Sequence, residues 1–396
     1  MFSTWTFIVF TIAVCLAYWL CPPRFRAYIL TAASFLYFFY FYREATIFLL
    51  IVAVAVFLWG LALKNSIKLQ KVILTTGVVL LVGILGYFKY AAFVAENINR
   101  ILSLFHLHRM TSIEAAIFIP LGISYFTFKM IHYLIDLKKG SIPSHRAIDF
   151  FNYIFFFPIL TAGPIERFQP FLKQSKTNNQ FHLENVYIAL PRIASGFFKK
   201  LVIAEPLALL AAYLQHPDLT IWQYWVASLA FTLQIYFDFS GYSDIAIGIS
   251  RLFGYEIMEN FNWPYLSRNV SDFWKRWHMS LTAWFRDYLF IPLGGSRTAF
   301  GIIILNTFIV MAVTGLWHGA GWHFVMWGLY HACGLVALRL YRKYLKTSVS
   351  KWINLKSQLV AGFNVLITFL FVNIGWVFFA CSATQSLYVV RHMAGL

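Results

Sequence analysis

Long apolar stretches recur along this chain, and they constrain its fold more than any other feature. The first runs from Phe2 to Leu20 without a charged residue, and two prolines end it. Further stretches of spanning length lie near residues 27–42, 45–63, 72–95 and 112–135. About 20 apolar residues in a helix cross the hydrocarbon core of a bilayer. The pattern predicts an all-α, polytopic integral membrane protein.

Composition excludes the soluble alternatives. Of the 396 residues, 60% are hydrophobic and 12% are charged, about half the charged share of an ordinary soluble domain. The net charge of +17 would suggest nucleic acid in a soluble protein. Here the cations lie in short loops, where they set topology and contact anionic lipid head groups, so the bilayer is the predicted partner and nucleic acid is not. The four cysteines lack CxxC spacing and predict neither a disulfide framework nor a metal site.

The basic loops alternate along the first half of the chain. Cations follow the first, third and fifth apolar stretches, in loops 22–26, 64–71 and 138–146, whereas Arg43 after the second stretch is balanced by Glu44. Cytoplasmic loops carry the excess of Lys and Arg. These three loops are therefore predicted to be cytoplasmic, and the N-terminus extracytoplasmic.

The second half of the chain is less regular. Apolar segments near 148–162, 186–213, 221–238 and 240–255 are interrupted by Pro, Gly and charged residues, and later ones lie near 300–316, 320–340 and 358–380. The stretch from Asn262 to Arg297 is rich in Trp, Arg and Asp, and backbone at membrane depth must be buried in protein or line a wet cavity. Short re-entrant or interfacial helices are expected there, with about ten or eleven spans in all. One domain, 1–396, is predicted, with peripheral helices in 1–110, a core in 111–340 and a C-terminal helix region in 341–396.

The most informative polar residue is His318, at the end of an apolar stretch. An ionisable side chain at this depth is costly and usually faces an interior cavity. Gly315 and Gly319 leave room beside the imidazole for a substrate or a backbone, and Trp317 and Trp322 can line that space. A neutral imidazole there can take a proton from a hydroxyl near pH 7 and return it. The alternative is a histidine that hydrogen-bonds a carbonyl in a helix contact.

A second histidine, His278, lies in the aromatic and basic segment 272–280. If the segment is helical, its aromatic residues Phe and Trp share one side and the cations Lys275 and Arg276 lie elsewhere. These cations and Trp274 suit a cytoplasmic interface, where they could meet phosphate or carboxylate. A plain interfacial belt is the alternative.

Two carboxylates, Asp238 and Asp244, lie in an otherwise apolar region. Six residues apart, they would not share a helix face, and Gly241 between them could break the helix. Carboxylates at membrane depth need partners, and Arg276, Arg286 or hydroxyls are candidates. The alternative is structural, with the two residues capping and tying broken helices.

Seven short motifs follow one another between about residues 120 and 320. They are Pro120-Leu-Gly-Ile-Ser-Tyr-Phe-Thr-Phe128, Gly163-Pro-Ile-Glu-Arg167, Asp238-Phe-Ser-Gly-Tyr-Ser-Asp244, Glu259-Asn-Phe-Asn-Trp-Pro-Tyr265, Phe273-Trp-Lys-Arg-Trp-His-Met-Ser-Leu281, Trp284-Phe-Arg-Asp-Tyr288 and Gly315-Leu-Trp-His-Gly319. Together they resemble the membrane-bound O-acyltransferase family, most nearly its bacterial exopolymer branch. That branch includes the membrane subunit of alginate O-acetyltransferase and the D-alanyl transfer protein of teichoic acids. The first hundred residues match in hydropathy only.

The resemblance implies a ring of helices around a tunnel that crosses the membrane. It implies that His318 is the family's near-invariant catalytic histidine, deep in the tunnel, and that His278 takes the place of its second functional polar residue. In this scheme His318 activates the acceptor hydroxyl as general base, while His278 orients the hydroxyl or shares the developing charge. The supporting or tunnel-lining candidates are Asp238, Asp244, Trp274, Lys275, Arg276, Arg286, Trp317 and Gly319.

The expected reaction is O-acyl transfer, in a bacterial plasma (inner) membrane, from a cytoplasmic thioester to a hydroxyl of an extracytoplasmic polysaccharide or its partner protein. Gly294-Gly295 favours the acetyl-transferring subgroup, whereas chain length favours the D-alanyl alternative. The donor is expected to be acetyl-CoA or a small acidic carrier protein with a phosphopantetheine arm, and no permanently bound cofactor is predicted. The basic cluster Arg268, Lys275 and Arg276 suits either donor. A covalent acyl intermediate stays open.

Two functions of other classes stay open. A solute transporter would show paired repeats and a midplane ion site, and neither is visible in the sequence. A noncatalytic scaffold for envelope enzymes is the other, and the intact His318 argues against a decayed enzyme.

Overall fold

The computed structural model describes residues 4–107, 120, 122–177, 180–347 and 357–396, and every regular element in those ranges is helical. The predicted all-α class is therefore correct. Within the same ranges, five helical segments are long and apolar enough to cross a membrane: Arg43–Asn65, Ile67–Leu104, Phe300–His318, Trp322–Leu345 and Gln358–Ala380. The apolar helix Trp5–Leu20 is shorter. The number of about ten or eleven spans stays a prediction, and part of the predicted span at 112–135 lies outside the described residues.

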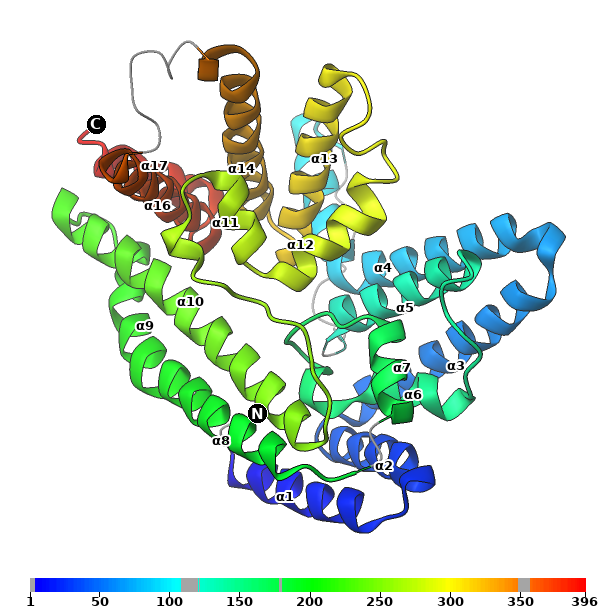
Figure 1. The fold of residues 1–396 in the computed structure, drawn as a ribbon. Helices are drawn as coiled ribbons and strands as arrows, with labels where there is room; N and C mark the ends of the chain where they lie inside the picture. The colour runs from blue at the N-terminus through cyan, green and yellow to red at the C-terminus, as the bar shows by residue number, and fades with distance from the viewer. Residues whose placement is uncertain (1–3, 108–119, 121, 178–179, 348–356) are drawn as a thin grey trace. The chain divides into compact units, whose positions relative to one another are not determined.

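The chain forms two compact units (Figure 1). The first contains Met1–Ser195 and Asp244–Met258, and the second contains Gly196–Ser243 and Glu259–Leu396. The predicted division at 110 and 340 within one domain stays a prediction.

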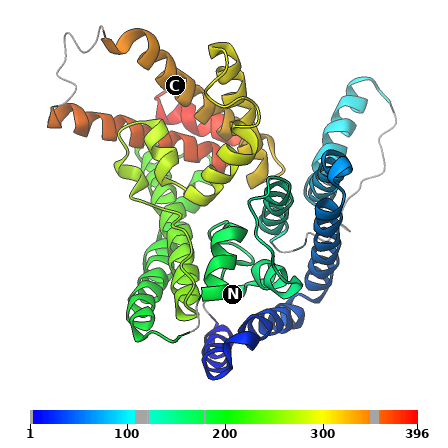
Figure 2. The same ribbon diagram turned by 45° about the vertical axis from the view of Figure 1, so that its right-hand side comes forward.

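Most helices of the first unit follow the predicted apolar stretches, whereas η1 and α7 lie between them. They are α1 (Trp5–Leu20), α2 (Pro23–Phe41), α3 (Arg43–Asn65), η1 (Ile67–Leu69), α4 (Gln70–Leu104), α5 (Ile123–Lys138), α6 (Ala147–Phe155), η2 (Phe157–Ile159), α7 (Phe168–Thr177) and most of α8 (Leu183–Phe197). The predicted stop after Leu20 is correct, and Pro23 opens α2, because the first helical N–H needs no partner within the helix. Figure 2 shows α1 and α2 as neighbours in dark blue.

The centre of the first unit is α5, which is buried along most of its length. Lys129 donates to the Tyr153 carbonyl at 2.7 Å, and the Tyr153 hydroxyl donates to the Glu166 carbonyl at 2.8 Å. The Glu166 carboxylate accepts from the backbone N–H groups of Met258 (3.0 Å) and Arg167 (3.1 Å). The Gly163–Arg167 motif thus lies in the core of this unit, where its carboxylate satisfies buried backbone donors.

The three basic loops of the first half lie near one another in this unit. Lys64, at the end of α3, acts electrostatically on His145 in the loop before α6. Tyr28, near the start of α2, acts in the same way on Arg146 in that loop. Loops that lie close together are on the same side of a membrane, so the arrangement agrees with a common face for 22–26, 64–71 and 138–146.

Cysteine labelling can test the side on which this face lies. In a cysteine-free background, a single cysteine at Lys68 should react only after the membrane is opened, and one at Thr4 should react in intact cells. The reason is that short loops rich in Lys and Arg stay in the cytoplasm. Labelling of position 68 by an impermeant reagent in intact cells would reverse the predicted orientation.

The second unit contains the remaining helices. They are η3 (Phe198–Ala204), α9 (Glu205–Ala211), η4 (Ala212–Gln215), α10 (Ile221–Leu252) up to Ser243, η5 (Pro264–Leu266), α11 (Val270–Arg276), α12 (Met279–Phe285), η6 (Arg286–Phe290), α13 (Phe300–His318), α14 (Trp322–Leu340), η7 (Tyr341–Leu345), α16 (Gln358–Ala380) and α17 (Ala383–Met393). The short helices expected in 262–297 are present as η5, α11, α12 and η6.

One sequence expectation fails in this region. The segments predicted near 221–238 and 240–255 are a single helix, α10, and Gly241 does not break it. Instead, a Cβ at Gly241 would lie 2.7 Å from the Gly196 carbonyl oxygen and 3.1 Å from the Lys200 nitrogen. Gly241 lets the backbone of α10 pack closely against the backbone around residues 196–200, as small residues often do between membrane helices.

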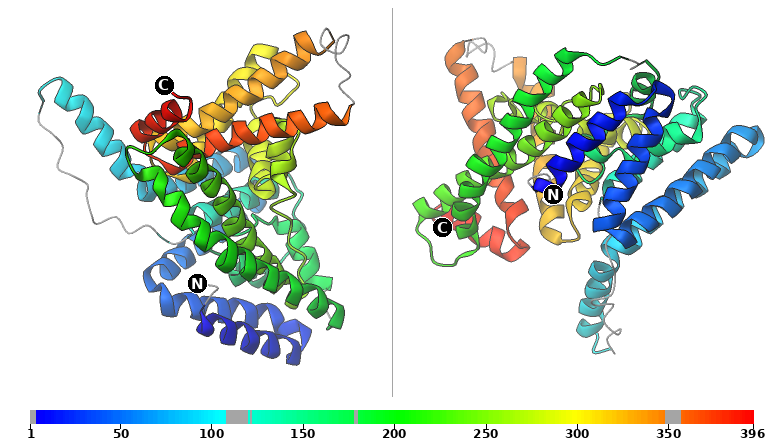
Figure 3. Two further views of the ribbon diagram at one scale, coloured as in Figure 1. Left: turned by 90° about the vertical axis from the view of Figure 1, so that its left-hand side faces the viewer. Right: turned by 90° about the horizontal axis from the view of Figure 1, so that it is seen from below.

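The antiparallel pair α13 and α14 has the closest backbone approach in the region of His318. A Cβ at Gly315 would lie 2.1 Å from the Phe324 carbonyl oxygen, and one at Gly328 would lie 2.2 Å from the Met311 carbonyl oxygen. Figure 3 shows the two helices side by side in yellow and orange. Neither position has room for a methyl group, so the pair is held together by glycine at two levels.

Candidate active site

His318 is the last residue of α13, and the chain turns back into α14 at Trp322. The imidazole is partly exposed. Its ring centroid lies 5.1 Å from those of Trp327 and Phe379, and 4.9 Å from that of Trp317. Trp317 lies beside the ring as expected. The lining by Trp322 stays a prediction, since that side chain is 51% exposed, while Trp327 and Phe379 contact the His318 ring.

The glycines after His318 make space for protein side chains. A Cβ at Gly319 would lie 1.9 Å from the Phe324 ring, so only glycine lets this ring lie against the turn. Phe324 in turn packs on Phe379 with centroids 5.0 Å apart. Gly319 therefore shapes the site indirectly, through an aromatic side chain on α14.

His278 lies at a break between two short helices. The sequence suggested one helix over residues 272–280, but the structure has two helices here, α11 and α12. His278 lies between them with a left-handed backbone conformation, φ 42°. A non-glycine residue in this region costs free energy and persists where the surroundings enforce it. The side chain is 1% exposed. The break turns the His278 imidazole into the interior of the second unit.

The hydrogen bonds around His278 determine its tautomer. Asn260 Nδ2 donates to Ser243 Oγ (3.3 Å), while Asn260 Oδ1 accepts from the Ser280 hydroxyl (2.6 Å) and backbone N–H (3.4 Å). The same Oδ1 lies 3.3 Å from His278 Nδ1. Since that oxygen can only accept, Nδ1 carries the proton and Nε2 carries a lone pair.

The Nε2 atom of His278 is buried and has no hydrogen-bond partner in the described part of the chain. A buried polar atom left unpaired costs about 1–3 kcal/mol. Such atoms in a native structure call for an explanation, such as a bound water or a catalytic role. The positioned lone pair is therefore the strongest sign of function at this histidine.

The two histidines belong to one cluster. The Trp317 ring contacts both the His278 ring, with centroids 5.9 Å apart, and the His318 ring, with centroids 4.9 Å apart. The two imidazoles are close enough for charge on His318 to act on His278. Phe239 of α10 covers the remaining side of His278, with centroids 4.7 Å apart. Sequence reasoning named both histidines, and the structure brings them together.

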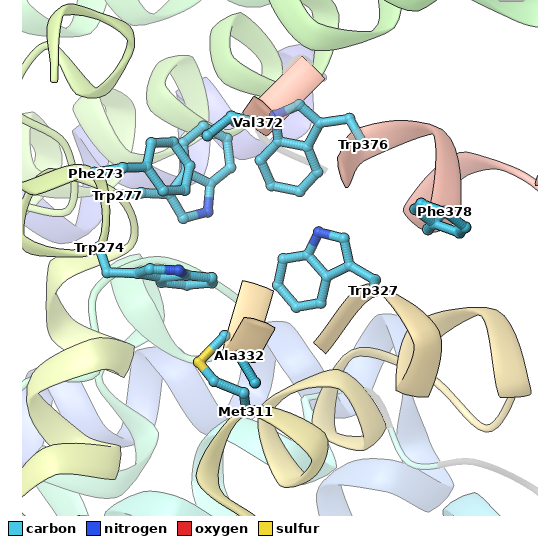
Figure 4. Close-up of a cluster of buried hydrophobic side chains, with 9 residues drawn as sticks. All are labelled: Phe273, Trp274, Trp277, Met311, Trp327, Ala332, Val372, Trp376 and Phe378. Atoms are coloured by element: carbon cyan, nitrogen blue, oxygen red, sulfur yellow. The ribbon is translucent and has the colours of Figure 1, made fainter. Parts of the chain in front are cut away.

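An aromatic core supports this cluster (Figure 4). It contains Phe273, Trp274, Trp277, Trp327 and Trp376, which converge from α11, α14 and α16. Trp327 and Trp376 stack with centroids 5.7 Å apart, and Phe273 and Trp277 with centroids 5.6 Å apart. Trp274 is 7% exposed and packs against Trp327, so its side chain lies inside the protein rather than on its surface.

A third histidine in this core was not singled out from the sequence. His331 is fully buried on α14, one helical turn after Trp327, and its two ring nitrogens have no hydrogen-bond partner among the described residues. Its ring contacts that of Trp274, with centroids 5.2 Å apart. An ionisable residue inside an apolar span was the signal that could have identified it.

The two aspartates take partners that the sequence did not suggest. Asp244 pairs with Arg192 of α8 at 3.0 Å in the first unit, and Asp238 pairs with Lys200 of η3 in the second. The predicted partners Arg276 and Arg286 are wrong. These ion pairs tie α10 to the helix beside it, which is the structural alternative given above.

The cations of the proposed donor segment lie outside the aromatic core. Lys275 is exposed on α11, and Arg276 pairs with Asp272 at 3.0 Å. Arg286, in the π-helical turn η6, pairs with Asp287 at 2.8 Å. The segment is thus amphipathic, with its tryptophans inside and its cations outside.

A cavity of about 150 Å³ lies next to the aromatic core, well above the roughly 10–15 Å³ needed for one water. Its apolar surface comes mainly from α12, η6 and α13. Arg286 and Arg339 also line it, as does Trp274, whose indole N–H is buried with no acceptor in the described ranges. Thr314, one helical turn before His318 on α13, lies at its edge. The cavity therefore combines cations, an apolar wall and an unused donor close to His318.

Comparison with known proteins identifies the family. The model of the membrane-bound O-acyltransferase family matches residues 35–384. The chain belongs to this family. It is therefore a multi-pass membrane acyltransferase, and the resemblance seen in the seven motifs is correct.

Several relatives are similar over most of the chain. A protein named probable alginate O-acetylase, from Pseudomonas aeruginosa, is 37% identical over 97% of this chain and 73% of its own length. A peptidoglycan O-acetyltransferase from Helicobacter pylori is 36% identical over 91% of this chain and 72% of its own length. A teichoic acid D-alanyltransferase from Bacillus subtilis is 32% identical over 66% of this chain and 68% of its own length.

Proposed function

We propose that this acyltransferase moves an acetyl group from a cytoplasmic thioester to a hydroxyl of an extracytoplasmic polysaccharide or its partner protein. The proposed site is the cluster of His318 and His278. The observation that carries the proposal is the His278 Nε2 lone pair, buried and held in place beside His318 in the core of a membrane protein. The proposed location is the bacterial plasma (inner) membrane with an extracytoplasmic N-terminus.

In the proposed reaction, His318 takes the proton of the acceptor hydroxyl as its oxygen attacks the thioester carbonyl carbon. The C–O bond of the ester forms, the C–S bond breaks, and His318 returns the proton to the sulfur that leaves. Positive charge develops on His318 along the way. The His278 lone pair, fixed by Asn260, stabilises that charge without reorganisation.

The cavity beside the aromatic core is suited to the donor arm. A pantetheine arm is an amphipathic chain with amide groups, and its phosphate end is anionic whether it belongs to coenzyme A or to a carrier protein. Arg286 and Arg339 supply cations for phosphate, and the Trp274 indole supplies an N–H for an amide oxygen. Since Thr314 at the edge of the cavity lies one turn from His318, a thioester threaded there would approach the imidazole.

Acetyl is favoured over D-alanyl as the transferred group. The relatives named as acetylases or acetyltransferases align with 97% and 91% of this chain, whereas the D-alanyltransferase from Bacillus subtilis aligns with 66%. D-alanyl transfer from a carrier-protein thioester is the second candidate, because that relative still shares 32% identity.

The deciding experiment supplies both donors to the purified protein in nanodiscs. Radiolabelled acetyl-CoA and D-alanyl carrier protein are offered in turn with an extracted envelope polysaccharide fraction, and label in the polymer is counted. Label from acetyl-CoA alone is the expected result. Label from D-alanyl carrier protein alone would replace the acetyl proposal with the second candidate.

Charge reversal at Lys275 tests whether the basic segment docks the donor. Lys275→Glu should raise the KM for the donor more than the KM for the acceptor, because the exposed cation attracts phosphate across solvent. Arg276 is less suitable, since it also holds Asp272. Arg391→Glu, an equal charge change on the exposed side of α17, is the matched control. An unchanged donor KM for Lys275→Glu in detergent, where no anionic leaflet is present, would leave lipid anchoring as the role of this segment.

A further inference from the structure

A second cavity lies in the first unit, between helices α2, α3 and α6. Its volume is about 420 Å³. Tyr28, Ala32 and Phe35 line it from one side of α2, at the spacing of a single helix face. Ile148 and Phe151 line it from α6 in the same way. The result is an apolar groove that runs along both helices, and none of its residues belongs to the proposed site.

One end of this groove carries positive charge. Arg146 immediately precedes α6, and Tyr28 at the corresponding end of α2 acts on it electrostatically. Its Nε and Nη2 donate to Asp149 at 3.3 and 3.0 Å. A guanidinium has five N–H donors in a planar fork, and the Arg146 side chain is 59% exposed, so part of the fork faces away from the protein.

Two lysines lie around the same loop. Burial lowers the pKa of His145, and the positive charges of Lys64 and Lys176 lower it further. Lys176 also donates to the Ser144 carbonyl at 2.9 Å, which holds it against the loop. Arg146 and Lys176 both act on the carboxylate of Asp149, and Lys64 adds a third positive charge beside the loop, so this end of the groove has excess positive charge.

We propose that this groove binds an anionic phospholipid, with one acyl chain along α2 and α6 and its phosphate at Arg146. Because the groove is apolar and lies in a membrane protein, a hydrocarbon chain fills it more favourably than water does. The excess charge at its end selects an anionic head group over a zwitterionic one. Arginine can hold phosphate bidentately, and Lys64 and Lys176 add point charges. A lipid bound in this way would join the ends of α2, α3 and α6.

Lipid titration of the purified full-length protein tests the proposal. Phosphatidylglycerol and phosphatidylcholine with identical acyl chains are added to the detergent-solubilised protein, and bound lipid is counted by native mass spectrometry. The wild type should retain phosphatidylglycerol in preference to phosphatidylcholine. Glycerol 3-phosphate should not displace the lipid, because it lacks the acyl chain that the groove holds. Equal retention of the two lipids, or displacement by glycerol 3-phosphate, would overturn the proposal.

Variants of the charged end locate the phosphate. Arg146→Gln should weaken phosphatidylglycerol binding about fivefold, the effect of one cation near a membrane surface. Arg100→Gln is the matched control, because it also removes an arginine from a local ion pair, with Glu96. Lys64→Gln leaves the Arg146–Asp149 pair intact and should weaken binding similarly, which guards against a folding defect in the first variant. Unchanged binding in both variants would overturn the assignment.

A second pair of variants tests the groove itself. Ala32→Phe places a ring in the groove and should reduce lipid retention whatever the head group. Ala55→Phe adds the same ring at an exposed position of α3 and should have no effect. If both variants retain lipid equally, the acyl chain does not lie in this groove and the proposal fails.

Discussion

Replacing His318 by alanine should abolish acyl transfer while the protein still inserts and folds. General acid–base catalysis by a positioned side chain contributes roughly 10²–10⁴ in rate, and His318 is the base of the proposed reaction. The side chain is partly exposed and its ring packs edge-on against Trp327 and Phe379. Alanine is a good helix former, so we expect the end of α13 to keep its fold. The measurement is kcat for acetyl transfer in nanodiscs.

The control for this variant is His182→Ala, which removes an exposed imidazole outside the cluster. It should retain wild-type kcat. Size-exclusion profiles and thermal melting of both variants show whether folding is intact. A purified His318→Ala protein that turns over near the wild-type rate would remove His318 from the mechanism.

The second large effect is expected at Gly315. Gly315→Ala places a methyl group about 2.1 Å from the Phe324 carbonyl oxygen, so α13 and α14 must separate. Overpacking of this kind typically costs 1–3 kcal/mol, and here it also displaces His318, three residues further along the same helix. Both the melting temperature and kcat should fall.

Gly301→Ala is the matched control on the same helix, because nothing lies within 4 Å of a Cβ at that position. There, alanine should be neutral or slightly stabilising, since it is the better helix former by about 1 kcal/mol. If Gly315→Ala melts and turns over like Gly301→Ala, the close approach of α13 and α14 is not what holds His318.

Much of the fold could be predicted because it depends on local properties of the sequence. The length and apolarity of a segment decide whether it can be a membrane helix, wherever the rest of the chain lies. The all-α class, the stop after Leu20 and the short helices of 262–297 therefore agree with the structure. His318 also stood out locally, since a titratable group at the end of an apolar span is costly, whereas His278 gained its role from the family resemblance.

The partners in ion pairs and in helix packing could not be predicted, because they are residues distant in sequence. Asp238 and Asp244 pair with Lys200 and Arg192, whereas the partners suggested from the sequence were Arg276 and Arg286. Gly241 illustrates the same limit, since a glycine that permits close packing looks locally like a glycine that breaks a helix.

The chemistry of the site was likewise decided only by tertiary structure. The sequence by itself determined a helical membrane protein with His278 and His318 in a family-specific order. It did not show that Asn260 fixes the proton on His278 Nδ1 and leaves Nε2 as a buried lone pair, or that Trp274 lies in the core beside His331. A tautomer follows from its hydrogen-bond partners, and burial follows from what packs on a side chain. Both are properties of the folded chain, because they arise where α10, α11, α13 and α14 meet.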